Sequence, residues 1–417
     1  MTVQIHYQAP LGWELKSIAS FVENYKGGAS LTPDDFRESG FPVIPKKGVQ
    51  EGGWLVIDEP TYCSESFAES NAQSKVDSNH VVVTLRDLVP SGPSIGLAVR
   101  IQQGLEFILS QGTYGLEINE FMNPDYFCAL SNSQPYRKAM RRIMVGSTQV
   151  HIRTGEFLDQ KFACPSMAEQ NKIAEILSAW DKSIEATERL LENSKKRKKA
   201  LMQQLLTGKK RLPGFKQPWS TTKLSTLCEI RRGASPRPIS DPSYFSDSGR
   251  GWVRISDVTS DETPFFRKTS QYLSPLGESK SVKVNDGDLI MSICATIGVP
   301  KFVKIPACIH DGFVVFRNPS DSLSLNLLYY VIQFITDKLD GEGQPGTQRN
   351  LNTSIVGEIQ FPKITTEEQE MIAEIFKLAD SSIGAINERL KSLRKEKDAL
   401  MQQLLTGKKR VFTSEAI

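Results

Sequence analysis

The sequence predicts an α+β protein of two domains, each followed by one long helix, with the two helices packed as an antiparallel coiled coil. The first observation is an exact repeat: residues 200–211, Ala-Leu-Met-Gln-Gln-Leu-Leu-Thr-Gly-Lys-Lys-Arg, return unchanged as residues 399–410. The second is weaker similarity at the same offset of 199 residues, which extends the repeat to about 166–211 and 365–410. Twelve identical residues do not recur by chance in 417, so the chain is a pseudo-two-fold tandem repeat.

Each repeat is predicted to form one helix of about 40 residues, roughly 60 Å long. In the first copy, Ser166 stands three residues before Glu169, which predicts a capping box in which the hydroxyl accepts a backbone N–H and the glutamate reaches back. Gly208 stands where a left-handed stop is needed. The second copy repeats these features with Thr365, Glu368 and Gly407.

Apolar residues at spacings of three and four form a narrow seam along both helices. The seam consists of Ile184, Leu191, Leu201 and Leu205 in the first helix and Ile383, Ile386, Leu390, Leu393, Leu400 and Leu404 in the second. Lys198 and Lys397 occupy matching slots in it. Two separate amphipathic helices on two cores are the alternative. A narrow stripe on so long a helix needs a partner of equal length, which favours packing of the two helices on each other.

The predicted boundaries are residues 1–150 for the first domain, 151–212 for the first spacer helix, 213–355 for the second domain and 356–417 for the second spacer helix. Strands are expected at 54–57, 81–85 and 107–109 in the first domain, and at 252–258, 289–292 and 312–317 in the second. A helix is expected from 124 to about 142 in the first domain, and from about 325 to 340 in the second. Both domains are therefore α+β.

Composition limits the class of protein. No apolar run approaches the ~18 residues of a membrane span, and the first residues lack the pattern of a signal peptide. Six scattered cysteines and four histidines argue against a zinc site and for buried free thiols in a reducing cytoplasm. The net charge is only +3, but residues 195–216 hold nine Lys or Arg and no acid. That run is either a solvated helix face or a contact with phosphate.

Catalytic motifs are weak. Asn123-Pro124-Asp125-Tyr126 is close to the Asn-Pro-Pro-aromatic motif of adenine methyltransferases, but no glycine-rich cofactor loop precedes it, so a capped helix start is the simpler interpretation. Glu278-Ser279-Lys280 with Asp261 imitates a nuclease triad, a spacing that is common in a chain with 24% charged residues. The sequence lacks a G-x-x-x-x-G-K-[ST] phosphate loop.

The whole chain resembles the specificity subunit of a type I restriction–modification system. The resemblance rests on the paired Leu-Leu-Thr-Gly-Lys-Lys-Arg helix ends and on the Glu-Gln start of each long helix. It rests further on Trp-Val-Arg-Ile-Ser-Asp at 252–257, Gly-Asp-Leu-Ile at 287–290, and Gly-Thr-Gln at 346–348 leading to Ile-Gln-Phe-Pro at 359–362. Its strength lies in the order of the motifs.

The resemblance implies that each domain is a target-recognition domain that reads one half of a split, asymmetric site in double-stranded DNA. The long helices are then the conserved spacers of the family, which dock two methylation subunits. Those subunits bind S-adenosylmethionine and methylate adenine, and restriction and translocase subunits complete the complex. This chain is expected to be a cytoplasmic, non-catalytic subunit that binds no cofactor, metal or membrane itself. A tandem of unlike halves suits a non-palindromic site, because palindromes are read by dimers of identical halves.

Candidates for DNA contact are the residue types that reach base edges or phosphates. Gly-Ala-Ser follows a basic residue in both domains, which makes these two loops the preferred sites. The candidates in the first domain are Lys26, Ser30, Lys46, Lys47, Arg86, Arg100, Tyr114 and Gln149. Those in the second are Arg231, Arg232, Ser235, Arg237, Arg254, Lys268, Lys280, Gln348 and Arg349. For each residue, an exposed side chain without a DNA contact is the alternative.

Two hypotheses about function come from different classes. The first is the sequence-specific DNA-binding subunit described above. The second is a non-catalytic scaffold whose coiled coil mediates assembly and whose globular domains bind protein or another ligand. Affinity for duplex DNA that depends on salt and prefers one sequence separates the two.

Overall fold

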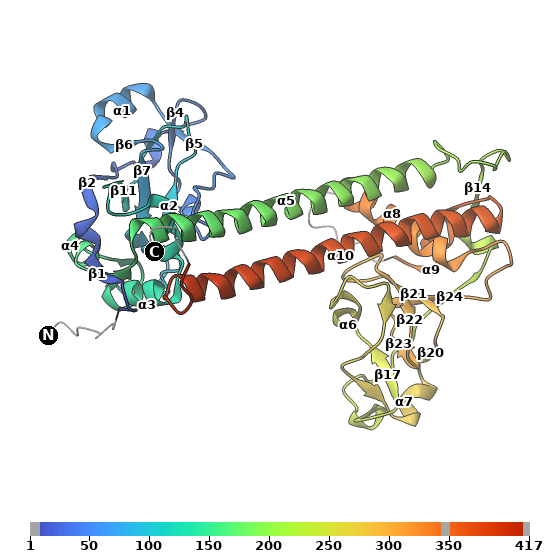
Figure 1. The fold of residues 1–417 in the computed structure, drawn as a ribbon. Coiled ribbons are helices and arrows are strands. Elements are labelled where there is room, and N and C mark those ends of the chain that lie inside the picture. The colour runs from blue at the N-terminus through green and yellow to red at the C-terminus, as the bar shows by residue number, and fades with distance from the viewer. Residues whose placement is uncertain (1–8, 343–350, 412–417) are drawn as a thin grey trace. The chain divides into compact units, whose positions relative to one another are not determined.

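The structure is a computed structural model that describes residues 9–342 and 351–411. The chain divides into two compact units: unit 1 comprises Met1–Arg189 and Glu388–Ile417, and unit 2 comprises Leu190–Asn387. Two helices of 39 residues, α5 (Met167–Leu205) and α10 (Thr366–Leu404), are the longest elements (Figure 1). Each unit therefore contains one globular domain, the first part of one long helix and the last part of the other.

The domain of unit 1 is built on a four-stranded antiparallel sheet with the order β2-β11-β7-β9, beside a five-stranded sheet β3-β5-β4-β10-β6. Its strands are β1 (Glu14–Ser17), β2 (Val22–Gly27), β3 (Phe36–Arg37), β4 (Phe41–Val43), β5 (Thr61–Cys63), β6 (Lys75–Val76), β7 (His80–Thr84), β8 (Arg86–Asp87), β9 (Ala98–Arg100), β10 (Phe107–Ile108), β11 (Thr113–Ile118), β12 (Val150–His151) and β13 (Lys161–Cys164). Its shorter helices are α1 (Glu65–Ser70), α2 (Pro124–Ser131), α3 (Gln134–Ile143) and α4 (Thr154–Leu158).

The domain of unit 2 contains two five-stranded sheets, β15-β24-β21-β22-β18 and β16-β19-β17-β23-β20. Its strands are β14 (Thr221–Lys223), β15 (Glu229–Arg232), β16 (Phe245–Ser246), β17 (Arg250–Val253), β18 (Phe265–Phe266), β19 (Tyr272–Leu273), β20 (Val282–Val284), β21 (Leu289–Ser292), β22 (Pro300–Val303), β23 (Ala307–Ile309), β24 (Phe313–Arg317) and β25 (Gln360–Pro362). Its shorter helices are α6 (Ile255–Thr259), α7 (Pro275–Ser279), α8 (Leu325–Glu342) and α9 (Thr353–Gly357).

The two domains share one framework despite their different sequences. In unit 1, β2 pairs antiparallel with β11, and β11 with β7; in unit 2, β15 pairs antiparallel with β24, and β24 with β21. The strand that enters each domain also pairs with the strand that leaves it, β1 with β13 and β14 with β25. The predicted α+β class and the tandem repeat are therefore confirmed.

The long helices run antiparallel inside both units. Partner numbers rise along α5 as they fall along α10, which is the signature of antiparallel packing. In unit 1 the pairs are Glu169–Arg410 at 2.7 Å, Asp181–Lys397 at 2.5 Å and Glu188–Arg394 at 2.6 Å. In unit 2 they are Lys198–Asp380 and Arg211–Glu368, both at 2.6 Å. Lys198 and Lys397, the two lysines predicted at seam positions, each pair with an aspartate of the other helix.

Each end of the helix pair is closed by a buried glutamate. In unit 2 the carboxylate of Glu368, 1% exposed, accepts hydrogen bonds from Nε and NH2 of Arg211 at 2.9 and 2.6 Å. In unit 1 Glu169, 3% exposed, accepts the same two bonds from Arg410 at 2.7 Å, and a third from Nε1 of Trp13 at 3.2 Å. The hydrogen bonds that each arginine donates to its glutamate raise the pKa of that arginine.

The predicted capping boxes are therefore half right. The hydroxyls of Ser166 and Thr365 do accept the backbone N–H three residues later, at 3.4 and 3.3 Å. The glutamate carboxylates do not turn back to the helix start, because the arginine from the other helix occupies them. The neighbouring glutamines, Gln170 and Gln369, are buried and hold the domain: their side-chain oxygens accept the backbone N–H of Asn123 at 2.9 Å and of Ser324 at 2.8 Å.

The glycine stops are confirmed. Gly208 and Gly407 have φ of +72° and +67°, which is the left-handed region that favours glycine. A Cβ at Gly208 would lie 2.3 Å from the ring of Trp219, and one at Gly407 would lie 2.5 Å from the ring of Pro10. Close approach thus adds to the conformational reason for glycine, because each helix end folds back against the start of a domain.

The predicted seam is buried at its clearest positions. Leu191, Leu205, Leu390, Leu393 and Leu404 are buried, and Ile184, Leu201, Ile383 and Leu400 are partly buried. The helix ends also bury residues that the seam omitted, because they pack on the domain cores. These are Ile173, Leu177 and Leu405 in unit 1 and Met202, Leu206, Ile372 and Phe376 in unit 2.

Three sequence-based elements are corrected. The strand expected at 252–258 ends at Val253, where Arg254 becomes the N-cap of α6 and its backbone N–H donates to Asp257 at 3.0 Å. The helix expected at 124–142 is two helices, because Ser133 caps a new start and Pro135 follows in its first turn. Residues 54–57 form only an isolated bridge, Trp54 to Arg100. The other expected strands and the helix near 325–340 are confirmed within one or two residues.

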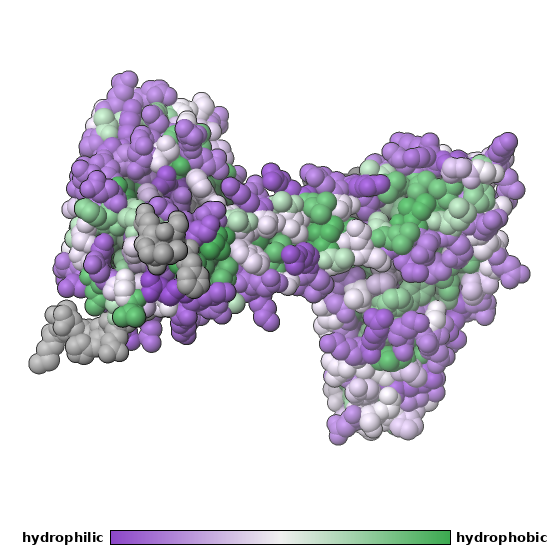
Figure 2. Space-filling model, viewed as in Figure 1, coloured by the Kyte–Doolittle hydropathy of each residue, from purple (hydrophilic) through white to green (hydrophobic). Residues whose placement is uncertain are grey.

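Hydrophilic residues cover most of the first domain in the view of Figure 2. Within the described residues no helix is both long enough and apolar enough to cross a membrane. All six cysteines are free, and five of them are buried, as expected.

Candidate nucleic-acid interface

One tight turn occupies the same place in both domains. The first turn (residues 110–113) leads into β11, and the second turn (residues 310–313) leads into β24. Each is closed by a backbone hydrogen bond of 3.0 Å, Thr113 N–H to Ser110 O and Phe313 N–H to His310 O. The residue that directly follows β7, Leu85, donates its backbone N–H to Gly112 O in the first turn, and the residue that directly follows β21, Ile293, donates its backbone N–H to Gly312 O in the second.

The Gly-Ala-Ser loops lie against these turns. Ala29 N–H donates to Leu109 O at 2.8 Å, and Ala234 N–H donates to Ile309 O at 3.1 Å. A Cβ at Gly28 would lie 1.9 Å from the carbonyl oxygen of Ser110, and one at Gly233 would lie 2.1 Å from that of His310. Only glycine fits this approach, so the predicted correspondence of the two loops is confirmed by their contacts.

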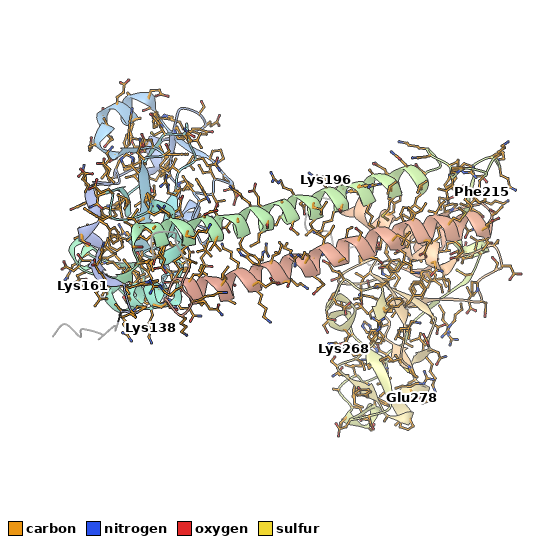
Figure 3. All side chains as sticks on the ribbon, viewed as in Figure 1. Lys138, Lys161, Lys196, Phe215, Lys268 and Glu278 are labelled. Atoms are coloured by element: carbon orange, nitrogen blue, oxygen red, sulfur yellow. The ribbon has the colours of Figure 1, made fainter. Side chains whose placement is uncertain are left out.

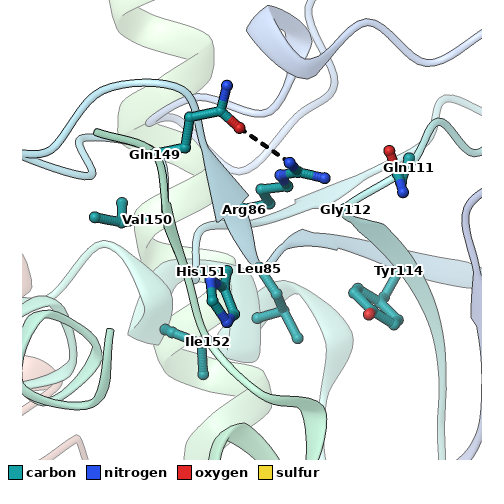
Figure 4. A pocket seen from close by; sticks show the side chains of 9 residues that line it. All are labelled: Leu85, Arg86, Gln111, Gly112, Tyr114, Gln149, Val150, His151 and Ile152. Atoms are coloured by element: carbon teal, nitrogen blue, oxygen red, sulfur yellow. Dashed lines mark hydrogen bonds between the residues drawn. The ribbon is translucent and has the colours of Figure 1, made fainter. Parts of the chain in front are cut away.

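In unit 1 the turn borders a cavity of about 410 Å³. Its lining consists of Leu85, Arg86, Gln111, Gly112, Tyr114, Gln149, Val150, His151 and Ile152. Arg86 and Gln149 point toward each other across it, and NH2 of Arg86 donates to Oε1 of Gln149 at 2.9 Å (Figure 4). Three predicted candidates, Arg86, Tyr114 and Gln149, are thus brought together.

The chemistry of this cavity suits base edges. An arginine fork matches the O6 and N7 acceptors of guanine, and a glutamine amide matches the N7 acceptor and N6 donor of adenine. The Arg86–Gln149 hydrogen bond satisfies part of both groups in the free protein, so DNA has to compete with it. Gly112 has φ +91°, and a Cβ there would lie 2.7 Å from Cβ of Arg86, so this glycine also makes room for the arginine.

In unit 2 the equivalent turn gathers charged side chains around Asp311. Its carboxylate accepts a hydrogen bond from Oγ of Ser235 at 2.6 Å and one from NH2 of Arg237 at 3.1 Å. Its backbone oxygen accepts a hydrogen bond from Nε of Arg232 at 2.8 Å. The hydrogen bond from Ser235 lowers the pKa of Asp311, whereas burial lowers the pKa of the neighbouring His310. Three predicted candidates are again brought together.

Other candidates of unit 1 are engaged inside the domain. Lys26 donates from Nζ to the backbone oxygen of Lys75 at 2.9 Å. Arg100 donates from NH2 to the backbone oxygen of Ser78 at 3.2 Å. Ser30 and Lys47 are exposed but lie outside the cavity lining, and the side chain of Lys46 is outside the described part of the structure.

Two of the remaining candidates of unit 2 lie beside the cluster around Asp311. Arg254 is close enough to His310 to act on it electrostatically. Lys280 is linked to Arg237 through Tyr244, whose hydroxyl donates to the backbone oxygen of Arg237 at 3.1 Å. Arg231, Arg254 and Lys268 are exposed, and Figure 3 shows Lys268 apart from Glu278 within the unit. Lys280 donates from Nζ to the hydroxyl of Tyr244 at 2.9 Å. Gln348 and Arg349 lie outside the described residues. The basic run of residues 195–216 is divided: Lys198 and Arg211 pair with α10, whereas Lys196 lies on the outer side of α5 (Figure 3).

Sequence reasoning missed Gln111, His151 and Asp311. The first two line the cavity of unit 1, and the third organises the cluster of unit 2. The available signal was a polar residue followed by glycine between two apolar strands, Gln111-Gly112 and Asp311-Gly312, in corresponding places of the two domains.

The catalytic look-alikes have structural roles. Oδ1 of Asn123 accepts the backbone N–H of Asp125 and of Tyr126 at 2.9 Å, which is the cap of α2. Glu278 pairs with Lys283 at 3.2 Å, whereas Asp261 pairs with Lys301 at 3.0 Å, so the supposed nuclease triad is dispersed. Among the residues that the structure describes, no cluster of three or more His, Cys, Asp or Glu could hold a metal ion.

Comparison with known proteins places the chain among DNA-specificity proteins. The family described as "Type I restriction modification DNA specificity domain" matches residues 10–193 and again residues 216–395. The type I restriction enzyme MjaVIII specificity subunit of Methanocaldococcus jannaschii is 24% identical over 97% of this chain and 94% of that protein. The putative MjaX specificity subunit of the same organism is 26% identical over 97% and 96%.

Solved structures share the fold. A chain from a study of assembly and conformational transition of the type I R-M system aligns with a TM-score of 0.62 and 18% identity, over 96% of this chain and 99% of its own length. The S subunit of a type I restriction–modification system from M. genitalium aligns with a TM-score of 0.55 and 14% identity, over 96% and 98%. Both alignments extend over the two domains and the two long helices.

Proposed function

The chain belongs to the family of type I restriction–modification specificity subunits, and we propose that each of its domains reads one half of a split, asymmetric DNA site. The observation that carries the proposal is that the two domains share one strand framework but have different side chains at equivalent positions. Arg86 in unit 1 corresponds to Cys294 in unit 2, because each follows the residue whose N–H bonds the turn. Gln111 corresponds likewise to Asp311. Equivalent positions with unlike chemistry suit two unlike half-sites.

The long helices supply the rest of the proposed function. They act as spacers that fix the separation of the half-sites and as docking surfaces for two methylation subunits. Leu190, Met371 and Leu378 are exposed apolar side chains on these helices, which a docked subunit would cover. S-adenosylmethionine would be bound by the methylation subunits, which methylate adenine, and restriction and translocase subunits would join to cut. The chain itself contributes recognition rather than catalysis.

Loss of one methylated motif is the expected result of deleting this gene from its host. Methylome sequencing with and without the gene would show a single split adenine motif disappearing, because the methylation subunits lose their only guide to that site. The same experiment gives the two half-sites. Persistence of every methylated motif in a host whose system is expressed would contradict the proposal.

Exchange of residues 1–150 for the corresponding segment of another family member is expected to change one half-site only. The described hydrogen bonds of the first turn lie within unit 1, so the exchange leaves the second turn and its side chains as they are. Methylome sequencing of the hybrid measures this. A change in both half-sites would contradict the assignment of one domain to one half.

The family assignment favours DNA over the protein-binding scaffold. The binding of duplex DNA by the assembled complex should weaken steeply with salt while the preference for the split site persists, because phosphate contacts release counterions and base contacts do not. Equal affinity for all duplexes would leave only non-specific binding.

A further inference from the structure

The guanidinium of Arg232 in unit 2 is held at its Nε atom, whereas its two terminal nitrogens are available for a ligand. It is the last residue of β15, its side chain is exposed, and its Nε is tied to the backbone oxygen of Asp311 at 2.8 Å. Within the described part of the chain, neither of its terminal nitrogens has a hydrogen-bond partner. A guanidinium fixed through Nε presents both terminal N–H groups in one plane, which is the arrangement for a bidentate contact.

Asp311 holds Arg232 through its backbone oxygen, and its carboxylate is already engaged within the protein. Each carboxylate oxygen already accepts one hydrogen bond, from Ser235 at 2.6 Å and from Arg237 at 3.1 Å. The hydrogen bonds of the Asp311 carboxylate with Ser235 and Arg237 thus tie the Gly-Ala-Ser loop and the residues that follow it to the second turn. One carboxylate with two guanidiniums leaves a net positive charge, so the cluster does not repel DNA.

The first domain places its arginine differently. The position equivalent to Arg232 is Gly27, because Gly27 pairs with Tyr114 as Arg232 pairs with Val314. Its arginine is instead Arg86 on β8, where unit 2 has Cys294. The two domains therefore approach DNA with an arginine from different strands, which argues that these arginines are recognition groups rather than parts of the shared scaffold.

We propose that Arg232 reads a guanine in the second half-site by a bidentate contact to O6 and N7, and that Asp311 is the positioning residue that holds Arg232 and Arg237 for it. The inference rests on the proposed function, since it identifies the base that the second domain takes. Bidentate pairing of arginine with guanine is the commonest specific contact between protein and DNA.

The test uses the complete complex and the split site obtained by methylome sequencing. Equilibrium binding is measured on the specific duplex and on duplexes in which each base pair of the second half-site is replaced in turn. With the wild-type chain, one guanine should discriminate by roughly 5- to 150-fold against other bases. Arg232→Lys keeps the positive charge but loses the planar fork, so this discrimination should fall toward 1 while affinity for unrelated duplex stays the same.

Asp311→Asn keeps the backbone oxygen that accepts from Nε of Arg232 but loses the carboxylate oxygen that accepts from Arg237, so the loop of Ser235 and Arg237 is held less firmly against the turn that holds Arg232. It should reduce the discrimination at that same base pair and leave all other positions unaltered. The matched control is Asp286→Asn, which removes an exposed carboxylate that pairs with Lys304 at 2.8 Å. Asp286 lies in the turn before β21, whereas the second turn contacts the residue after the other end of β21. The control should leave discrimination at every position unchanged. Because Arg232 is exposed, thermal melting of its variant should match that of the wild type.

The outcomes separate the two proposals. If the complex prefers no split site, the proposed function itself fails. If a split site is bound but Arg232→Lys weakens all duplexes alike or leaves the guanine preference intact, Arg232 is a phosphate contact or a bystander and only this inference is overturned. If Asp311→Asn preserves the preference, the positioning role is overturned. A second half-site in which no guanine is discriminated from other bases also overturns the proposal that Arg232 reads a guanine.

Discussion

Replacement of Arg211 by alanine is expected to destabilise unit 2 by about 3 kcal/mol, the low end of the range for breaking one partner of a buried ion pair. The cause is Glu368, which is 1% exposed and would stay buried without its countercharge. The low end applies because the Arg211 side chain retains 20% exposure and water can reach the site. The arginine also stacks 5.5 Å from the ring of Trp219, so some packing is lost as well.

Hydrogen exchange under increasing denaturant measures this effect, because peptides from each unit report their own free energy of opening. A single unfolding transition cannot be assumed for a chain of two units. Arg410→Ala in unit 1 is the matched comparison and should cost less, since Arg410 is 43% exposed and Glu169 keeps its hydrogen bond from Trp13. Adding Glu368→Gln to Arg211→Ala should recover part of the loss by removing the buried charge. Equal losses in both units, or no recovery, would contradict this account.

The same glutamates show what the sequence could and could not predict. A hydroxyl residue three positions before a glutamate correctly predicted where each helix begins, because capping is local chemistry. The use of the carboxylate was not predictable, because its partner lies 241 residues away for Glu169 and 157 for Glu368. The longer repeat, residues 166–211 and 365–410, nevertheless contains both partners: each copy ends with the arginine that pairs with the glutamate at the start of the other copy.

Local competition explains the element errors. Residues 252–258 have the apolar content of a strand, but Asp257 accepts the backbone N–H of Arg254 and starts a helix there. Residues 124–142 have a helical pattern, yet Ser133 and Pro135 offer a new start that splits it. Such caps decide between two structures of similar intrinsic preference, so periodicity alone does not settle them.

The candidate site was predictable to the extent that residue type and local motif determine it. The Gly-Ala-Ser loops were found because only glycine fits the close backbone approach, a constraint that leaves a trace in the sequence. Lys26, Arg100 and Lys280 were chosen for their charge but have partners inside their domains. Asp311 was missed because a search for positively charged residues does not consider a carboxylate, although this one accepts hydrogen bonds from Ser235 and Arg237.

Substitution of Leu390 and Leu393 by lysine is expected to destabilise the helix pair of unit 1 by roughly 3–6 kcal/mol, from about 1.5–3 kcal/mol for each leucine removed from a buried position. Both leucines are buried, and in this stretch Arg394 of α10 pairs with Glu188 of α5 at 2.6 Å. The long lysine stems can reach solvent, which places the effect toward the lower value. Because Leu390 and Leu393 lie outside the core cluster of the domain, exchange protection should fall first in the helices and only later in strands such as β7 and β11.

The matched control for this double substitution is Leu190→Lys with Leu378→Lys, the same chemical change at two exposed positions of α5 and α10, 54% and 61% exposed. In the free chain the control should leave exchange unaltered within about 0.5 kcal/mol, as is usual for surface substitutions. In the assembled complex, a loosened helix pair should also relax the preference for one spacer length between the half-sites, because the spacer is then no longer held rigidly. Unchanged protection of both helices together with an unchanged spacer preference would mean that Leu390 and Leu393 do not hold the helices together.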